Sequence, residues 1–302
     1  MTIILKLNID ADFIAQLILI ARDAGDAILN IYHAPETINV QIKIDQSPLT
    51  AADTISHNII VQALTNLLPI PIVSEEATLP NFAERKTWRE YWLIDPLDGT
   101  KEFIARTDEF TVNIALVQNG VPVLGVVHVP VVDETYVGCS MGVGYSKSAE
   151  SSIGFFSEQK SYAEKYRHGK KIANLKTRNL GRRFAARHNL VVLASARHGS
   201  DATAILLQKI AQHWPASIQI LNVGSSLKFC WIAEGRADFY PRLAPTCEWD
   251  TAAAQAILVA AGGAVVNAKN LAPLMCNASE NLVNPSFYAF GDNQFNWALL
   301  NI

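Results

Sequence analysis

The hydrophobic pattern of the first half of the chain predicts two helices followed by several strands. Apolar residues recur at helical spacing from Phe13 to Tyr32, with polar residues between them. A second helical pattern runs from about Leu49 to Leu68 and is bounded by prolines. Short segments rich in β-branched and aromatic residues follow and predict strands; they are Ile70–Ser74, Tyr91–Ile94, Phe110–Val117 and Val121–Val129. Gln118-Asn119-Gly120 lies between the last two and predicts a hairpin turn.

The second half alternates between strand and helix patterns, which predicts an α/β arrangement. The strand patterns are Leu190–Ser195, Ile218–Val223 and Ala237–Tyr240, and the helical patterns are Asp201–His213, Ser225–Glu234 and Thr251–Ala261. Residues 146–188 separate the two halves and are strongly basic from Lys160 to Arg187, where Glu164 is the one acidic residue. We interpret this stretch as a basic insert.

The length of 302 residues exceeds the roughly 100 to 200 residues of one typical domain. We therefore predict an N-terminal α+β domain over residues 1–188, including the insert, and a C-terminal α/β domain over residues 189–302. The net charge of −3 argues against a general nucleic-acid binder, whose affinity depends on many Lys and Arg contacts to phosphates. An anionic ligand would have to be bound by a few local cations.

The four cysteines, Cys139, Cys230, Cys247 and Cys276, are scattered and form no CxxC pair. Neither a zinc site nor a disulfide framework is predicted, and a reducing cytoplasm fits best. Polar residues interrupt the apolar N-terminus before a signal peptide can form. Charged residues between Phe13 and Tyr32 also exclude a spanning helix, which needs about 20 apolar residues.

Acidic residues directly follow two of the predicted strands. Glu75 and Glu76 come after the first, and Asp95 and Asp98 come after the second. Carboxylates this close raise one another's pKa unless a cation lies between them. Ligands that offer only oxygen favour Mg²⁺ over zinc. The alternative is a simple turn in which Asp95 and Asp98 flank Pro96.

Two further features extend this acidic pattern. Gly99 and Thr100 open a short helical stretch whose free N–H groups could hold a phosphate. Asp250 precedes the predicted helix Thr251–Ala261, where it is either an N-cap or a metal ligand from the second domain. Two metals sharing such carboxylates would bind both the nucleophile and the leaving oxygen of a displacement.

The order and spacing of three motifs resemble the signature of the lithium-sensitive, metal-dependent phosphomonoesterases of the inositol monophosphatase superfamily. The motifs are Ser74-Glu75-Glu76, Asp95-Pro96-Leu97-Asp98-Gly99-Thr100 and Trp249-Asp250. The resemblance runs from about Ala11 to Pro285, apart from the insert. A finer resemblance is to the 3'(2'),5'-bisphosphate nucleotidases of the CysQ type. It rests on four segments: Asp45-Gln46-Ser47-Pro48-Leu49-Thr50-Ala51-Ala52-Asp53, Thr100-Lys101-Glu102-Phe103, Gly224-Ser225-Ser226-Leu227-Lys228-Phe229-Cys230 and Tyr240-Pro241-Arg242.

The resemblance implies a layered α-β-α-β-α sandwich of the sugar-phosphatase type, with an antiparallel N-terminal sheet and a smaller mixed C-terminal sheet. It implies that two or three Mg²⁺ ions are bound by Glu75, Asp95, the Leu97 carbonyl, Asp98 and Asp250. It also implies that Asp53 and Thr100 form a catalytic pair that orients the attacking water. Substrate contacts are implied for Glu75, Leu97, Asp98, Gly99, Thr100, His198, Ser225, Lys228, Arg242 and Asp250.

Several of these residues have simpler alternative roles. Glu76 is expected to act as a hydrogen-bond acceptor beside the metals or as a surface charge rather than as a ligand. His198 could be an ordinary loop residue, Ser225 a helix cap, and Lys228 and Arg242 solvated charges. The functional role of the last two is favoured because a substrate with two phosphates needs a cationic clamp away from the metals, and Arg suits phosphate.

The implied reaction is hydrolysis of adenosine 3',5'-bisphosphate to AMP and phosphate, with the sulfated nucleotide as a second candidate substrate and inhibition by Li⁺. A cytoplasmic location is expected, with peripheral association with the inner membrane as a further expectation from the resemblance. One alternative is an inositol or sugar phosphatase with the same metal chemistry. Another is a non-catalytic binding protein, against which the complete set of carboxylates argues.

Overall fold

A computed structural model describes residues 9–34, 41–42, 48–140, 161–194 and 201–301. Its helices are α1 (Ala11–Tyr32), α2 (Ala51–Leu67), α3 (Phe82–Arg85), α4 (Thr100–Ala105), η2 (Pro130–Val132), α5 (Leu180–Ala185), α6 (Asp201–His213), α7 (Leu227–Ala233), α8 (Ala252–Ala260) and η3 (Trp297–Leu300). Its strands are β1 (Gln41–Ile42), β2 (Pro48–Leu49), β3 (Ile72–Ser74), β4 (Glu90–Asp98), β5 (Thr111–Gln118), β6 (Val121–Val129), β7 (Glu134–Cys139), β8 (Tyr162–Arg167), β9 (Lys170–Asn174), β10 (Leu190–Ala194), β11 (Ile218–Asn222), β12 (Phe239–Arg242), β13 (Ala264–Asn267) and β14 (Phe287–Phe290).

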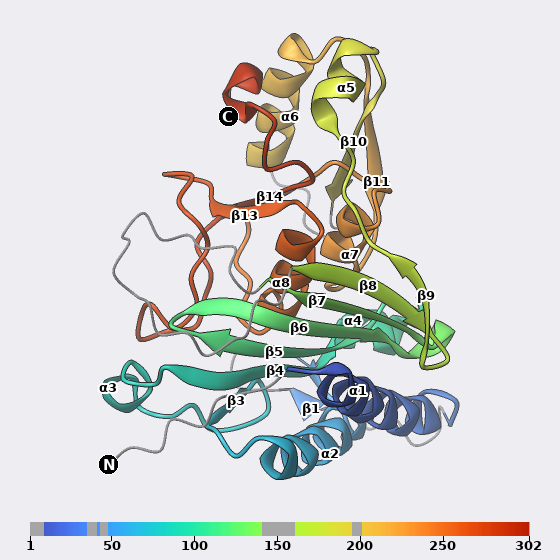
Figure 1. Cartoon of the computed structure of the whole chain (residues 1–302), viewed down its shortest axis with the longest axis vertical. Coiled ribbons are helices and arrows are strands. Elements are labelled where there is room, and N and C mark those ends of the chain that lie inside the picture. The colour runs from blue at the N-terminus through green and yellow to red at the C-terminus, as the bar shows by residue number, and fades with distance from the viewer. Residues whose placement is uncertain (1–8, 35–40, 43–47, 141–160, 195–200, 302) are drawn as a thin grey trace.

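The elements stack in five alternating layers, which confirms the predicted sandwich (Figure 1). Helices α1 and α2 cover one face of a large sheet of strand order β3-β4-β5-β6-β7-β8-β9. Helices α7 and α8 lie between that sheet and a smaller one of order β11-β10-β12-β14-β13. Helices α5 and α6 form the outer layer beyond the smaller sheet. Three buried clusters fill the spaces between these layers.

Local sequence signals account for the start of the first two helices and for one hairpin. The Asp10 carboxylate caps α1 by accepting from the Phe13 amide at 2.9 Å. Thr50 and Asp53 form a capping box at the start of α2. Between β5 and β6, Asn119 and Gly120 both have positive φ, at 50° and 77°, which is the turn geometry that fits a two-residue hairpin.

The N-terminal sheet is mixed, so the expectation of an antiparallel sheet is wrong at one edge. Strand β3 runs parallel to β4, whereas the other neighbours in this sheet are antiparallel. A parallel pair needs a long crossover, and α3 with its flanking loops supplies that crossover between β3 and β4. The C-terminal sheet is mixed, as predicted.

The described part of the basic insert is built into the fold rather than appended to it. Strand β8 pairs with β7 along its whole length, and β9 forms the edge of the large sheet. The Leu180 side chain of α5 instead packs in the cluster beside the smaller sheet. The domain boundary remains a proposal, and this arrangement favours a position between β9 and α5 over one at residue 188.

Candidate active site

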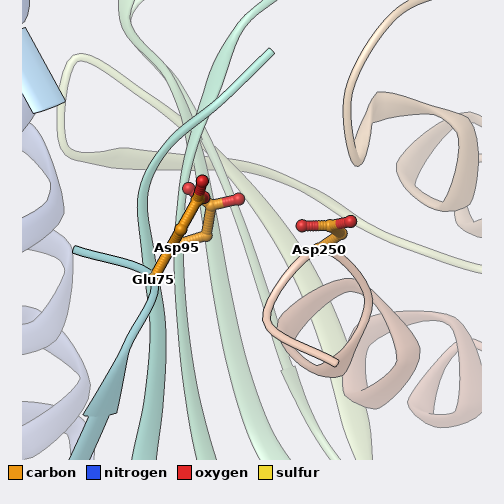
Figure 2. Close-up of side chains that lie close together, drawn as sticks. All are labelled: Glu75, Asp95 and Asp250. Carbon is orange, nitrogen blue, oxygen red and sulfur yellow. The ribbon is translucent and has the colours of Figure 1, made fainter. Parts of the chain in front are cut away.

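Three carboxylates from three separate segments meet at one end of the large sheet. Glu75, Asp95 and Asp250 each place an oxygen within 4.8 Å of the others (Figure 2). Ser74 lies beside Ile94 in the parallel ladder of β3 and β4, so the next residues along, Glu75 and Asp95, come together. Asp250 approaches from the loop before α8. We call these residues the acidic triplet.

The electrostatics of the acidic triplet favour a bound cation. Burial raises the pKa of Asp95 well above its usual value, and the charges of Glu75, Asp98 and Asp250 raise it further. Burial likewise raises the pKa of Asp250, with contributions from Asp98 and Glu75. The three groups therefore resist being ionised together, and a divalent cation removes that cost. The donor set is all oxygen, which suits a hard cation such as Mg²⁺.

The Asp95-Pro96-Leu97-Asp98 segment is a bulge within a strand, so the simple-turn alternative is wrong. Strand β4 continues to Asp98, which pairs with Thr111, and the register shifts between Asp95 and Asp98. The Asp95 carboxylate accepts from the Leu97 amide at 3.0 Å. A bulge of this kind redirects side chains next to an active site.

Thr100 and Asp53 lie within hydrogen-bond reach of one another, as their predicted pairing requires. The Thr100 hydroxyl is 3.3 Å from Asp53 Oδ1 and 3.3 Å from the Leu97 carbonyl oxygen. Asp53 is buried, and its other oxygen accepts from the Thr50 amide at 2.7 Å and the Thr50 hydroxyl at 2.6 Å. Gly99, at φ +93°, precedes Thr100, which begins α4 as predicted.

Asp98 lies beside the acidic triplet, and its side chain is held by hydrogen bonds from Ser226 and Asn113. Its Oδ2 accepts from the Ser226 amide at 2.6 Å and the Ser226 hydroxyl at 2.7 Å. Asn113 Nδ2 lies 3.4 Å from the same oxygen. Sequence reasoning did not single out Ser226 or Asn113. The doubled serine after Gly224 was the available signal, but only the backbone conformation decides which serine faces Asp98.

Asp250 does not act as a helix cap. The N-cap residue of α8 is Thr251, and Asp250 Oδ2 accepts from the Cys247 amide at 2.8 Å. The carboxylate therefore closes a turn before the helix and presents its other side to Glu75 and Asp95 (Figure 2).

A cavity of about 130 Å³ is lined by the carboxylates Asp98 and Asp250 and also by the cations Lys101, Lys228 and Arg242. Its lining combines residues from the end of β4 and from α4 with residues of the second half of the chain, and it consists of Asp98, Gly99, Lys101, Glu102, Gly224, Ser225, Lys228, Phe229, Tyr240, Arg242, Thr246, Asp250, Thr251 and Phe287. The cavity thus brings together most of the residues for which substrate contacts were predicted.

The two predicted phosphate-binding cations are held in place, so neither is a freely solvated charge. Lys228 is only 5% exposed, and its ammonium donates to the Ser225 carbonyl at 2.9 Å. Burial lowers the pKa of Lys228 to about 8, and Arg242 also lowers it. The Arg242 guanidinium donates to the Ala244 and Pro245 carbonyls, each at 3.0 Å.

Of the remaining residues considered in the sequence analysis, Ser225 lines the cavity, whereas Glu76 does not belong to the acidic triplet. Ser225 lines the cavity and has a positive φ of 44°, and its hydroxyl is 3.5 Å from the Leu227 amide, so a weak capping contact exists. Glu76 is not one of the acidic triplet, and its amide donates to Ser74 Oγ at 3.3 Å. His198 lies outside the described residues.

Within the part of the chain that the structure describes, no helix has both the length and the hydropathy needed to cross a membrane.

Known proteins resemble this chain over nearly its whole length. The sequence model of the inositol monophosphatase family matches residues 10–289. The 3'(2'),5'-bisphosphate nucleotidase CysQ of Escherichia coli (strain K12) is 41% identical over 273 residues, which cover 90% of this chain and 97% of that protein. The protein of the same name from Haemophilus influenzae is 35% identical over 96% of this chain and 97% of its own length.

Solved structures agree with the sequence comparison. CysQ from Bacteroides thetaiotaomicron, a bacterial member of the inositol monophosphatase family, superposes with a TM-score of 0.72 at 37% identity, covering 93% of this chain and 97% of that one. The extragenic suppressor protein SuhB from Bartonella henselae has the same fold, with a TM-score of 0.69 at 20% identity over 96% of this chain and 98% of that one. The chain therefore belongs to the inositol monophosphatase family and is a member of the CysQ type.

Proposed function

We propose that the protein is a Mg²⁺-dependent 3'(2'),5'-bisphosphate nucleotidase that hydrolyses adenosine 3',5'-bisphosphate to AMP and phosphate. The observation that carries the proposal is one cavity whose lining includes the carboxylates Asp98 and Asp250 together with the anchored cations Lys228 and Arg242. Such a cavity suits a ligand with two separate phosphates, one at the metals and one at the cations. The activity in the names of the CysQ relatives supports the same assignment.

The metal ligands in this proposal are Glu75, Asp95, Asp98, Asp250 and the Leu97 carbonyl, with two or three Mg²⁺ ions per site. Their all-oxygen composition and the raised pKa values of Asp95 and Asp250 support a hard divalent cation. When bound, the cation lowers the pKa of a water molecule and stabilises the leaving oxygen.

The side chains of the N-terminal domain would orient the attacking water. The Thr100 hydroxyl donates its proton to Asp53 Oδ1, which leaves a Thr100 lone pair free to accept from the water. Thr50 holds the other oxygen of Asp53 with two hydrogen bonds, and these fix the carboxylate in the orientation in which Oδ1 accepts the Thr100 hydrogen bond. The pair thus aligns the nucleophile without forming a covalent phosphoenzyme.

The 5'-phosphate would bind at Lys228 and Arg242, away from the metals. The Arg242 fork is oriented by two backbone carbonyls, and Lys228 carries its charge below a pH of about 8. The sulfated nucleotide carries the same pair of phosphates and is the second candidate substrate.

A substrate panel tests the proposal. Purified protein with Mg²⁺ is assayed on adenosine 3',5'-bisphosphate, the sulfated nucleotide and inositol 1-phosphate, with and without Li⁺. We expect the highest kcat/KM on the bisphosphate, dependence on Mg²⁺ and inhibition by Li⁺. Faster hydrolysis of inositol 1-phosphate would favour the sugar-phosphatase alternative, and hydrolysis of none of them would favour the binding-protein alternative.

The cytoplasmic location and the peripheral association with the inner membrane also belong to this proposal. Both rest on the resemblance alone. Cell fractionation followed by a salt wash of the membranes measures them.

A further inference from the structure

The loop between β11 and α7 brings the C-terminal domain into very close contact with the N-terminal domain. The Gly224 amide donates to Glu109 Oε2 at 2.8 Å. A Cβ atom on Gly224 would lie 2.9 Å from Glu102 Cγ and 3.0 Å from the Glu109 carbonyl oxygen, so a larger residue does not fit there. Ser225, the next residue, has the uncommon positive φ of 44°. Strained backbone of this kind is frequent at functional sites.

This backbone conformation directs Ser226 into the interface, where it is only 1% exposed. Its amide and hydroxyl both lie within 2.7 Å of Asp98 Oδ2, and the hydroxyl also lies 2.6 Å from the Asp250 carbonyl oxygen. One residue therefore touches a carboxylate of the first domain and the backbone of a carboxylate residue of the second.

A buried amide sets the direction of the Ser226 hydroxyl. Asn113 Nδ2 donates to Ser226 Oγ at 2.9 Å, and the Thr111 hydroxyl donates to Asn113 Oδ1 at 3.0 Å. Both Asn113 and Thr111 are buried. Because the serine oxygen accepts from Asn113, its single proton points toward Asp98 or the Asp250 carbonyl.

We propose that Ser226, oriented by Asn113, is a positioning residue for the metal site. Its hydrogen bonds fix the position of Asp98 Oδ2 relative to the Asp250 backbone. Among the described residues, the hydrogen bonds that Asp98 accepts all go to Oδ2, so Oδ1 is the oxygen that would bind a cation. The proposal rests on the metal assignment of the proposed function and adds residues that do not themselves bind the metal.

The hydrogen bonds that orient metal ligands contribute measurably to metal affinity. Removing such a partner typically weakens metal binding or activity about 10- to 100-fold. Ser226→Ala removes the hydroxyl but keeps the amide contact to Asp98. We therefore expect Mg²⁺ to bind this variant about 10- to 100-fold more weakly than the wild type.

The test is calorimetric titration of Mg²⁺ into the full chain in the absence of substrate. Ser140→Ala is the matched control, because Ser140 is also buried and donates to a backbone carbonyl, that of Pro122, outside the acidic triplet and the cavity. We expect Ser140→Ala to bind Mg²⁺ as the wild type does. Equal Mg²⁺ affinity of wild type and Ser226→Ala would overturn the proposal.

Asn113→Ala provides a second variant in case Ser226→Ala does not fold. It should weaken Mg²⁺ binding severalfold, and the double variant should lose less affinity than the sum of the two single losses, because Asn113 acts on Asp98 mainly through Ser226. Unchanged affinity in Asn113→Ala, or fully additive losses, would contradict the proposal.

The calorimetry also separates this proposal from the proposed function. If the wild type binds Mg²⁺ but hydrolyses no bisphosphate, the nucleotidase assignment fails and the effect of Ser226→Ala on Mg²⁺ can still be read. If the wild type binds no Mg²⁺, the positioning role fails as well.

Discussion

The carboxylates of the site, which we call its acidic side, and the cations Lys228 and Arg242, which we call its cationic side, are held in place in different ways. On the acidic side, Glu75 and Asp95 are brought together by a parallel strand ladder, so their spacing is fixed by backbone pairing. On the cationic side, Lys228 lies in the first turn of α7 and Arg242 at the end of β12, each anchored to backbone carbonyls. The difference indicates that the residues for catalysis and the residues for binding the second phosphate are positioned by separate structural elements. Substitutions on the two sides should therefore have separable effects.

The largest expected effect is on the acidic side. Asp98→Asn or Asp250→Asn replaces a charged metal ligand with a neutral near-isostere, and we expect kcat to fall by orders of magnitude while the far-UV circular dichroism is unchanged. Steady-state kinetics at saturating Mg²⁺ measure the effect. A variant that kept more than about a tenth of the wild-type kcat, a loss of only about 1.4 kcal/mol, would contradict the metal assignment.

The catalytic pair should show nearly as large an effect. Thr100→Ala should lower kcat about 100-fold or more with little change in Mg²⁺ affinity, and Asp53→Asn should act alike. The double variant should lose far less than the sum of the two losses, because the residues act as a unit. Additive losses would show that they act separately.

Asp53→Asn and Thr100→Ala should differ in their effect on the stability of the protein. Asp53 also belongs to the capping box of α2, so Asp53→Asn should lower the free energy of unfolding by about 1 kcal/mol. Thr100→Ala makes no such change. Chemical denaturation of both variants separates the structural role of Asp53 from its catalytic one.

On the cationic side, Arg242→Ala should affect bisphosphates selectively. A charge-assisted hydrogen bond contributes about 1.5 to 3 kcal/mol, so kcat/KM for adenosine 3',5'-bisphosphate should fall roughly 10- to 100-fold. Activity on adenosine 3'-monophosphate should hardly change, since that substrate has no 5'-phosphate. Equal losses on the two substrates would rule out the 5'-phosphate clamp.

A smaller effect is expected from the pKa of Lys228, which burial lowers to about 8. Lys228 loses its charge as the pH rises through that value, so kcat/KM for the bisphosphate should decline above pH 8 relative to the 3'-monophosphate. The Arg242 charge contributes to the lowered pKa, so in Arg242→Ala the decline should move to higher pH. Rate profiles from pH 6 to 10 on both substrates measure this, and superimposable profiles would contradict it.

The smallest effect is expected from the basic insert, because long-range attraction of the substrate by its Lys and Arg residues is the alternative to binding by Lys228 and Arg242. Strand β9 is five positions from β4, about 24 Å at the usual strand spacing, whereas screening at 0.15 M salt acts over about 8 Å. Lys171 is paired with Glu164, and Arg183 contacts Asp238 at 3.5 Å. Neutralising Lys170, Lys171, Arg182 and Arg183 should therefore leave kcat/KM nearly unchanged at two salt concentrations. A loss that shrinks as salt rises would instead support attraction of the substrate by the basic insert.

The sequence by itself determined the elements whose signals are local. The helix Asp201–His213 and the strand Val121–Val129 have the predicted bounds, and the turn at Asn119-Gly120 is where its residue types require it. The spacing of the acidic motifs was sufficient to indicate the family. Periodicity, turn residues and short motifs are properties of neighbouring residues, so they can be recognised before the chain is folded.

Only the tertiary structure showed the role of charged residues inside the sheet. Strand β8 was not predicted because its sequence contains charged residues. In the structure Lys165 does not face water but is paired with Glu134 of β7 and with Glu234 at the end of α7. The burial of Lys228 was likewise invisible in its sequence context.

The long-range pairings were also decided only by the fold. The parallel pairing of β3 with β4, the place of β13 and β14, and the contact of Ser226 with Asp98 join residues far apart in the chain. Which serine of Ser225-Ser226 meets Asp98 depends on one positive φ angle and on the space that Gly224 leaves. These features were not predictable because their stabilising contacts form only when distant segments pack together, and local sequence patterns do not depend on such contacts.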